Sequence, residues 1–114
     1  MKFFRLLLLL LLAFQTQSEQ LKNILFVGNS YLYYNNSVHN YVEPMLREHH
    51  GSEIETKLSA IGGSKLHHHN IDHLLNPKNL NLDQQIDLLI LQGGSTEVVS
   101  EKDQEKFIQT VQQY

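Results

Sequence analysis

The stretch Ile24-Leu25-Phe26-Val27-Gly28-Asn29-Ser30-Tyr31 decides the fold that the sequence predicts. Four apolar residues run without a break into glycine, asparagine and serine. A short apolar run of this kind is typical of a strand that is buried on both faces, as in parallel sheets. The strand ends at a turn, which either serves only to reverse the chain or presents the Ser30 hydroxyl for chemistry.

Two later segments repeat this arrangement. An alternating pattern predicts a second strand over residues 53–58, and the apolar run at 86–91 predicts a third. Glycine-bearing turns follow them, Gly62-Gly63-Ser64 and Gln92-Gly93-Gly94-Ser95. Because the carboxyl ends of parallel strands lie along one edge of a sheet, we expect all three turns to meet at one rim.

Helical patterns lie between and after the strands. We expect Ser37 to cap a helix that ends near Gly51, and Pro44 to kink this helix or delay its start. A short helix is predicted within residues 66–75, and another is predicted after Ser100. Five apolar residues of the first helix are predicted to share one face: Val38, Tyr41, Val42, Met45 and Leu46.

This alternation predicts an α/β fold, a three-layer doubly wound parallel sheet in the flavodoxin-like style with right-handed crossovers. Three strands make a small sheet whose open edges need cover. We therefore expect the chain to be truncated, the front portion of a larger domain of this kind.

The first residues have the layout of a secretory signal peptide. Lys2 and Arg5 precede an apolar run at 6–14, and polar residues follow over 15–20. The apolar run is shorter than the roughly 20 residues that a permanent membrane helix needs. We expect a signal peptide over 1–18, a domain over 19–114 in a secreted or periplasmic protein, and no stable membrane insertion after cleavage. An uncleaved membrane anchor is the alternative.

Composition excludes several classes of protein. The 114 residues include no cysteine, so neither a disulfide framework nor a thiolate metal site can form. The net charge is −3 and the charges are mixed along the chain, without a basic stripe. We therefore expect no nucleic-acid partner.

Seven histidines raise the possibility of a metal site. If residues 66–75 formed one helix, His69 and His73 would lie one turn apart and could bind zinc, although a third ligand would be needed. The metalloprotease spacing His-Glu-x-x-His does not occur. The favoured interpretation is a solvated helix face, with no metal and no organic cofactor, and His39 is placed on the exposed face of the first helix.

The three turns together resemble the blocks of the SGNH (GDSL-type) hydrolase family. "ILFVGNSYLYYNN" looks like the Gly-Asn-Ser variant of the first block, "AIGGS" is similar to the second, and "LQGGSTE" matches the third only loosely. The resemblance covers nearly all of residues 22–114. It implies the flavodoxin-like fold given above and hydrolysis of carboxylic esters, with a small-molecule or polysaccharide ester as substrate.

The resemblance also implies roles for individual residues. Ser30 would be the nucleophile, and its backbone N–H would contribute to the oxyanion hole. Gly63, preferred over Gly62, would supply a second N–H. Thr96 stands where the family has an asparagine donor, and Gln92 is the other candidate for that contact.

The family's fourth signature, Asp-x-x-His, does not occur in the 114 residues. A serine hydroxyl is a weak nucleophile without a base in hydrogen-bond reach, so we expect this chain alone to be nearly inactive. Two alternatives follow. A non-catalytic ligand-binding module on the same scaffold fits the missing base, whereas a dinucleotide-binding half is disfavoured because Gly-x-Gly-x-x-Gly is absent. Tyr31, Tyr33 and Tyr34 would form an aromatic wall for substrate or pack over the rim.

Overall fold

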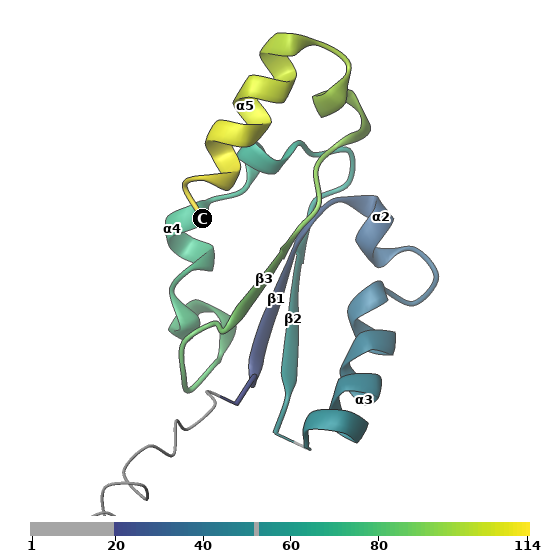
Figure 1. Cartoon of the computed structure of the whole chain (residues 1–114), viewed down its shortest axis with the longest axis vertical. Helices are drawn as coiled ribbons and strands as arrows, with labels where there is room; N and C mark the ends of the chain where they lie inside the picture. The colour runs from purple at the N-terminus through teal and green to yellow at the C-terminus, as the bar shows by residue number, and fades with distance from the viewer. Residues whose placement is uncertain (1–19, 52) are drawn as a thin grey trace, which may run out of the picture.

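The computed structural model describes residues 20–51 and 53–114, so the predicted signal peptide over 1–18 lies outside the described residues. Within them the chain forms a small α/β domain around a parallel sheet of order β2-β1-β3 (Figure 1). The strands are β1 (Asn23–Gly28), β2 (Glu55–Ala60) and β3 (Leu88–Leu91). The α-helices are α2 (Ser30–Tyr33), α3 (Val38–His50), α4 (Ile71–Leu74) and α5 (Glu101–Val111), and the 3-10 turns are η1 (Leu66–His68), η2 (Pro77–Leu80) and η3 (Ser95–Val98).

The central strand β1 sets the register of the sheet. Gly28 lies opposite Ala60 on β2, and Val27 lies opposite Leu91 on β3. The strands therefore end at the same rim, as the sequence predicted. Strand β2 is shifted by two residues from the predicted range, and β3 begins two residues late, because each is bounded by its pairing with β1.

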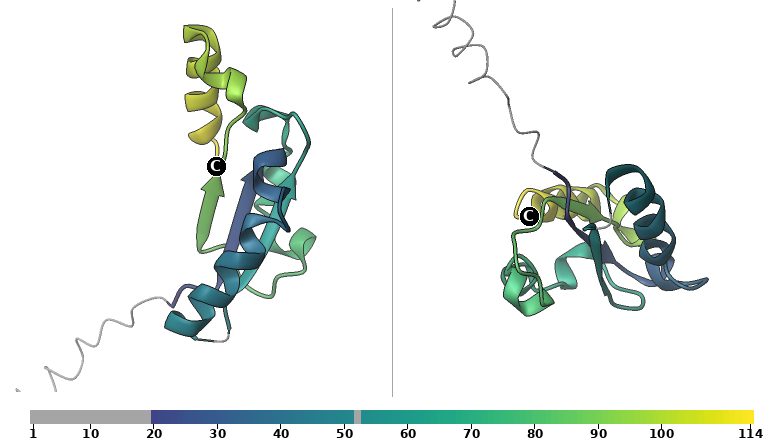
Figure 2. Two further views of the ribbon diagram at one scale, coloured as in Figure 1. Left: turned by 90° about the vertical axis from the view of Figure 1, so that its right-hand side faces the viewer. Right: turned by 90° about the horizontal axis from the view of Figure 1, so that it is seen from below.

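Helices lie on both sides of the sheet, and α3 lies on the opposite side from α4 and α5 (Figures 1 and 2). The alternating side chains of β1 supply both cores. Ile24 and Phe26 face the side of α3, and Leu25 and Val27 face the other side. All four are at most 4% exposed, so β1 is buried on both faces, as predicted from its unbroken apolar run.

The predicted first helix forms as α3 and ends at Gly51, which adopts a positive φ of 106°. The predicted delay caused by Pro44 is wrong, because the helix begins at Val38 and continues past the proline. Proline at this position removes the hydrogen bond that the Asn40 carbonyl would accept and crowds that carbonyl, and the helix continues in spite of both effects. Ser37 precedes the helix but makes no side-chain capping bond. The turn predicted after the first strand contains the short helix α2.

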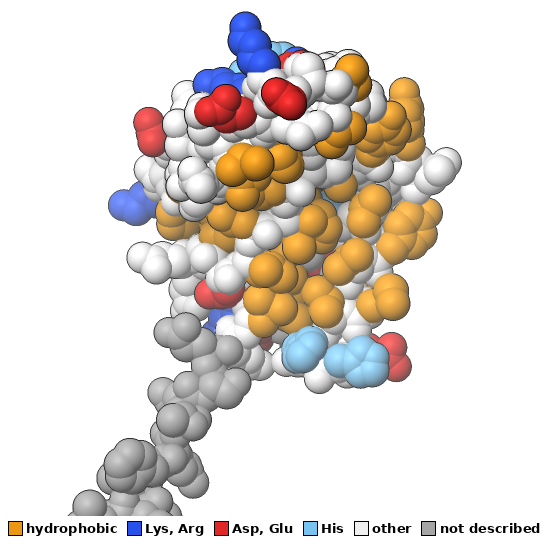
Figure 3. Space-filling model, turned by 45° about the horizontal axis from the view of Figure 1, so that its top comes forward, with side chains coloured by type: hydrophobic (Ala, Val, Ile, Leu, Met, Phe, Trp, Pro, Cys, Tyr) orange, Lys and Arg blue, Asp and Glu red, His pale blue; other side chains and the backbone are white. Residues whose placement is uncertain are grey.

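The buried face of α3 is narrower than predicted. Val42 and Leu46 pack against the core, whereas Val38, Tyr41 and Met45 are exposed. Figure 3 shows hydrophobic side chains gathered on one face of the molecule, and Leu88 and Ile90 of β3 are also exposed. Within the described residues, no helix combines the length and the apolar character needed to cross a membrane.

Polar contacts with β2 determine which face of α3 lies against the sheet. One carboxylate oxygen of Glu43 accepts hydrogen bonds from the backbone N–H (2.9 Å) and the hydroxyl (2.6 Å) of Thr56. These bonds bring the Glu43 side of the helix toward β2. His39, one turn earlier, lies against Phe26 with 6.3 Å between ring centroids. The prediction that His39 lies on the exposed face is therefore wrong.

The predicted helix over 66–75 is also wrong as a single element. The chain forms the turn η1, then an extended residue at His69, and then the four-residue helix α4 capped by Asn70. Leu66 is fully buried in the core, and tertiary contacts at this point override the helical pattern. As a result His69 and His73 do not share a helix face.

Candidate functional site

The first turn begins where β1 ends at Gly28. Asn29 caps α2, and its side-chain Oδ1 accepts a hydrogen bond from the Tyr31 N–H at 3.1 Å. Ser30 is the first residue of this short helix and is half-buried. The preference of asparagine for the capping position therefore fixes where the Ser30 backbone and side chain lie.

Asn29 joins all three turns. Its side-chain Nδ2 donates to the carbonyl of Ser64 at 3.1 Å and to the carbonyl of Gly93 at 3.3 Å. Its backbone N–H donates to Oε1 of Gln92 at 3.1 Å. The side chain is buried, with 3% of the residue exposed. The predicted convergence of the three turns at one rim is confirmed by these contacts.

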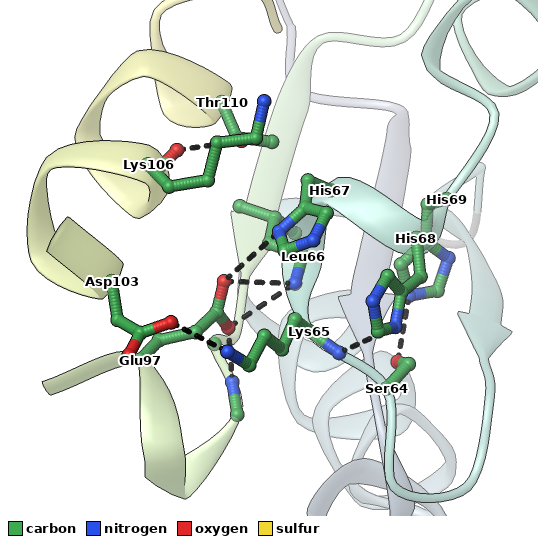
Figure 4. Close-up of polar contacts among 12 residues, drawn as sticks. Ser64, Lys65, Leu66, His67, His68, His69, Glu97, Asp103, Lys106 and Thr110 are labelled. Atoms are coloured by element: carbon green, nitrogen blue, oxygen red, sulfur yellow. Dashed lines mark hydrogen bonds and ion pairs between the residues drawn. The ribbon is translucent and has the colours of Figure 1, made fainter. Parts of the chain in front are cut away.

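His69 joins the second turn to the end of β1. Its Nε2 lies 2.9 Å from the Gly28 carbonyl, and its Nδ1 lies 3.3 Å from the Ser59 hydroxyl. Since a carbonyl can only accept, Nε2 carries the hydrogen and Nδ1 accepts from Ser59. The Ser64 hydroxyl also donates to the Gly28 carbonyl, at 3.3 Å. Figure 4 shows Ser64 and His69 side by side on this segment.

The environment of His69 favours its neutral form. The residue is 6% exposed, and burial lowers its pKa, with the charge of His68 acting in the same direction. The hydrogen bond to the Gly28 carbonyl raises the pKa of His69, but its effect is smaller than that of burial. The expectation of a solvated histidine face is therefore wrong for His69, which is part of the buried support of the rim.

Glu97 joins the second turn to the third. It is 2% exposed, and its two carboxylate oxygens accept from the Leu66 N–H at 3.2 and 3.1 Å (Figure 4). One of these oxygens also accepts from the Gly94 N–H. A Cβ at position 93 would lie 2.8 Å from the Phe107 ring, so any larger residue there would displace this ring. Glu97 is not among the site residues predicted from the sequence, although its place three residues after Gly94 is a capping-box spacing.

The predicted N–H donors of the oxyanion hole are free of other partners. Among the described residues, no hydrogen bond uses the backbone N–H of Ser30 or of Gly63. Gly63 has a positive φ of 70°, and no atom lies within 4 Å of the position a Cβ would occupy. The space beside Gly63 is therefore open. By contrast, a Cβ at Gly62 would lie 2.9 Å from the Tyr33 hydroxyl, so Tyr33 covers that residue.

The two candidates for the third donor differ in position. Gln92 lies beside Asn29, but its Oε1 accepts from the Asn29 N–H and its Nε2 contacts the Gly93 carbonyl. Thr96 is exposed on η3, and no hydrogen bond from its side chain to the first turn is found in the described part of the chain. The geometry thus brings Gln92 next to the first turn and leaves Thr96 outside these contacts.

Neither a base nor a metal centre is found with these residues. Within residues 20–51 and 53–114, no hydrogen bond joins the Ser30 hydroxyl to a histidine or a carboxylate, and no three metal-ligating side chains are grouped to hold a metal ion. No protein-family model matches the chain, and no curated protein or solved structure matches it. The site is therefore interpreted from its own geometry.

Proposed function

We propose that this chain carries the nucleophile and oxyanion-hole portion of an SGNH-type serine esterase that acts on carboxylic esters. The observation that carries the proposal is the set of bonds from Asn29 to the other two turns. These bonds hold the Ser30 turn against the segments that contain Gly63 and Gln92. The strand order β2-β1-β3 with helices on both sides is compatible with the beginning of a doubly wound, flavodoxin-like sheet.

In the proposed reaction the Ser30 hydroxyl oxygen attacks the ester carbonyl and loses its proton to solvent, and the tetrahedral intermediate expels the alcohol portion of the ester. The acyl group remains on the Ser30 oxygen until water attacks it and releases the carboxylic acid. Negative charge develops on the former carbonyl oxygen. The unpartnered N–H groups of Ser30 and Gly63 are available to stabilise it, and removal of one such donor typically costs about 10²–10³ in kcat. Gln92 would contribute only if its amide left the Gly93 carbonyl, and Thr96 only if η3 moved.

Removal of the Ser30 proton is the step that these residues do not support. Because the hydroxyl has no basic partner in the described structure, it reacts mainly through the small fraction that is ionised. We therefore expect Ser30 to react only with activated esters, whose leaving groups need no general acid, and we expect that rate to rise with pH. A histidine acting as general base would complete the site.

The proposed setting is outside the cytoplasm, where the substrate would be a small-molecule or polysaccharide ester. The support is the layout of residues 1–18, with Lys2 and Arg5 ahead of an apolar run and polar residues after it. Amino-terminal sequencing of the exported protein tests this part of the proposal. An intact Met1 on the exported protein would contradict cleavage.

The test of the chemistry is hydrolysis of p-nitrophenyl acetate by the full chain, compared with Ser30→Ala. Ser37→Ala is the matched control, because Ser37 lies in the loop after α2 and its hydroxyl, among the described residues, bonds only to the nearby Tyr33 carbonyl. We expect a low rate that Ser30→Ala abolishes and Ser37→Ala preserves. Equal rates in all three proteins would remove Ser30 from catalysis.

A ligand-binding module without catalysis is the second candidate. It is favoured by the absence, among the described residues, of a base bonded to the Ser30 hydroxyl. The two functions are separated by the same variants: the module predicts that Ser30→Ala changes neither turnover nor the binding of an ester-bearing sugar.

A further inference from the structure

A pocket lies between residues at the start of η1 and the helix α5. Its volume is about 410 Å³, which is within the usual range for sites that bind small molecules. Its lining residues come from the start of η1 and from α5, and α5 lies on the side of the sheet away from α3 (Figure 1). It is lined by Lys65, His67, Lys102, Asp103, Glu105, Lys106 and Gln109.

Two of the three lysines in this pocket have no carboxylate partner. Asp103 is paired with Lys65 at 2.6 Å, and Glu105 accepts from the Gln109 amide at 3.3 Å. In the described part of the chain, no carboxylate oxygen lies within 4.0 Å of the ammonium group of Lys102 or Lys106. Like charges four residues apart on a helix repel each other. An anion between these two side chains would remove that repulsion.

His67 lies beside the lysines as a polar group of the pocket. Burial lowers its pKa, and the positive charges of His68, Lys106 and Lys65 act in the same direction, against the opposing effect of Glu97. Its Nδ1 is buried without a hydrogen-bond partner in the described residues, 3.9 Å from the Glu97 carboxylate. These effects on the pKa favour the neutral form of the ring. Figure 4 shows Lys65 and Lys106 on either side of it.

We propose that this pocket binds a tetrahedral oxyanion, a phosphate or sulfate group, between Lys102 and Lys106 with His67 at its edge. The lining holds three lysines and two carboxylates, Asp103 and Glu105, so its net charge favours an anion over a cation. The pocket is larger than an inorganic ion, so it has room for a sugar that carries the group. This site uses neither Ser30 nor the oxyanion-hole residues, and it stands or falls independently of the proposed esterase.

The test is titration of the ¹⁵N-labelled full chain with inorganic phosphate, and separately with glucose 6-phosphate and glucose 6-sulfate. Sodium chloride keeps the ionic strength constant, so that general screening does not count as binding. We expect saturable shifts confined to the amides of residues 65–67 and 102–109. Tighter binding of the sugar esters identifies an esterified group as the ligand, and equal binding identifies the free ion.

The variants separate a built site from general attraction to lysines. Lys102→Gln combined with Lys106→Gln is compared with Lys78→Gln, which makes the same change at an exposed lysine on η2 outside the pocket. The double variant should bind about tenfold more weakly or worse, the loss expected for roughly 1.4 kcal/mol of interaction, and Lys78→Gln should bind like the wild type. Equal affinities for all three, or shifts spread over every lysine, would mean an adventitious ion only and would overturn the proposal.

Discussion

Replacing Asn29 with alanine should destabilise the domain far more than the loss of one exposed cap. The change removes the acceptor for the Tyr31 N–H, a loss that typically costs about 1 kcal/mol. It also removes the donor to the buried Ser64 carbonyl, and an unsatisfied buried group costs about 1–3 kcal/mol. The Gly93 carbonyl keeps its contact with Gln92, so it adds little. The free energy of unfolding should therefore fall by about 2–4 kcal/mol.

Urea unfolding followed by far-ultraviolet circular dichroism measures this change. Asn70→Ala is the matched control, because Asn70 caps α4 through the same kind of bond, to the His73 N–H, but is exposed, and its side chain makes no hydrogen bond to another turn in the described part of the chain. It should cost about 1 kcal/mol. Asn29→Asp separates the two contributions, since it keeps the capping oxygen and loses the donor. At neutral pH it should be nearly as unstable as Asn29→Ala.

The reasoning is refuted if Asn29→Ala is no more destabilising than Asn70→Ala. It is also refuted if Asn29→Asp has wild-type stability, because the bonds that join the turns would then contribute nothing beyond the cap.

Three further predictions concern the support of the rim. Gly93→Ala should lower the free energy of unfolding by about 1–3 kcal/mol, because the new Cβ would meet the Phe107 ring at 2.8 Å. Gly63→Ala should lower it by about 1 kcal/mol, because only the positive φ of this residue is strained. Urea midpoints in the reverse order would contradict the packing around Gly93. The free energy of unfolding should decline as the pH falls below the usual histidine pKa of 6.5, because buried His69 has a lowered pKa and the unfolded chain binds the proton more readily. Urea unfolding at several pH values should show a shallower decline for His69→Gln than for the wild type. An identical decline in the two proteins would refute this role of His69. The carboxyl groups with lowered pKa values, Glu43 and Asp103 among them, lose their contribution only as the pH falls below about 4.5, so the two effects occupy different pH ranges in the same measurement.

The centre of the fold could be predicted from the sequence because the apolar run of β1 identifies a strand that is buried on both faces. The two neighbours of β1 are parallel to it and end at the same rim. Local pattern and tertiary burial agree there. The position of Ser30 at the end of this strand, and the meeting of the three turns, followed from that agreement.

The residues after the second turn could not be predicted in the same way. The apolar spacing between Leu66 and Leu75 is helical. However, the Leu66 N–H donates to Glu97, 31 positions away, and the His69 ring is hydrogen-bonded to the Gly28 carbonyl. Neither contact leaves a local signal. The same applies to α3, whose apolar stripe is wider than its buried face. The bonds that Thr56 donates to Glu43 show which part of this helix faces the sheet.

The most direct test of the presented serine is peptide mapping by mass spectrometry after exposure of the full chain to p-nitrophenyl acetate. With no base bonded to Ser30 in the described structure, removal of an acetyl group should be as slow as its attachment, and the acetylated chain should accumulate. The account predicts acetyl on Ser30, absent in Ser30→Ala and unchanged in Ser37→Ala. Acetyl found only on lysine, tyrosine or histidine side chains, to the same extent in all three proteins, would contradict it.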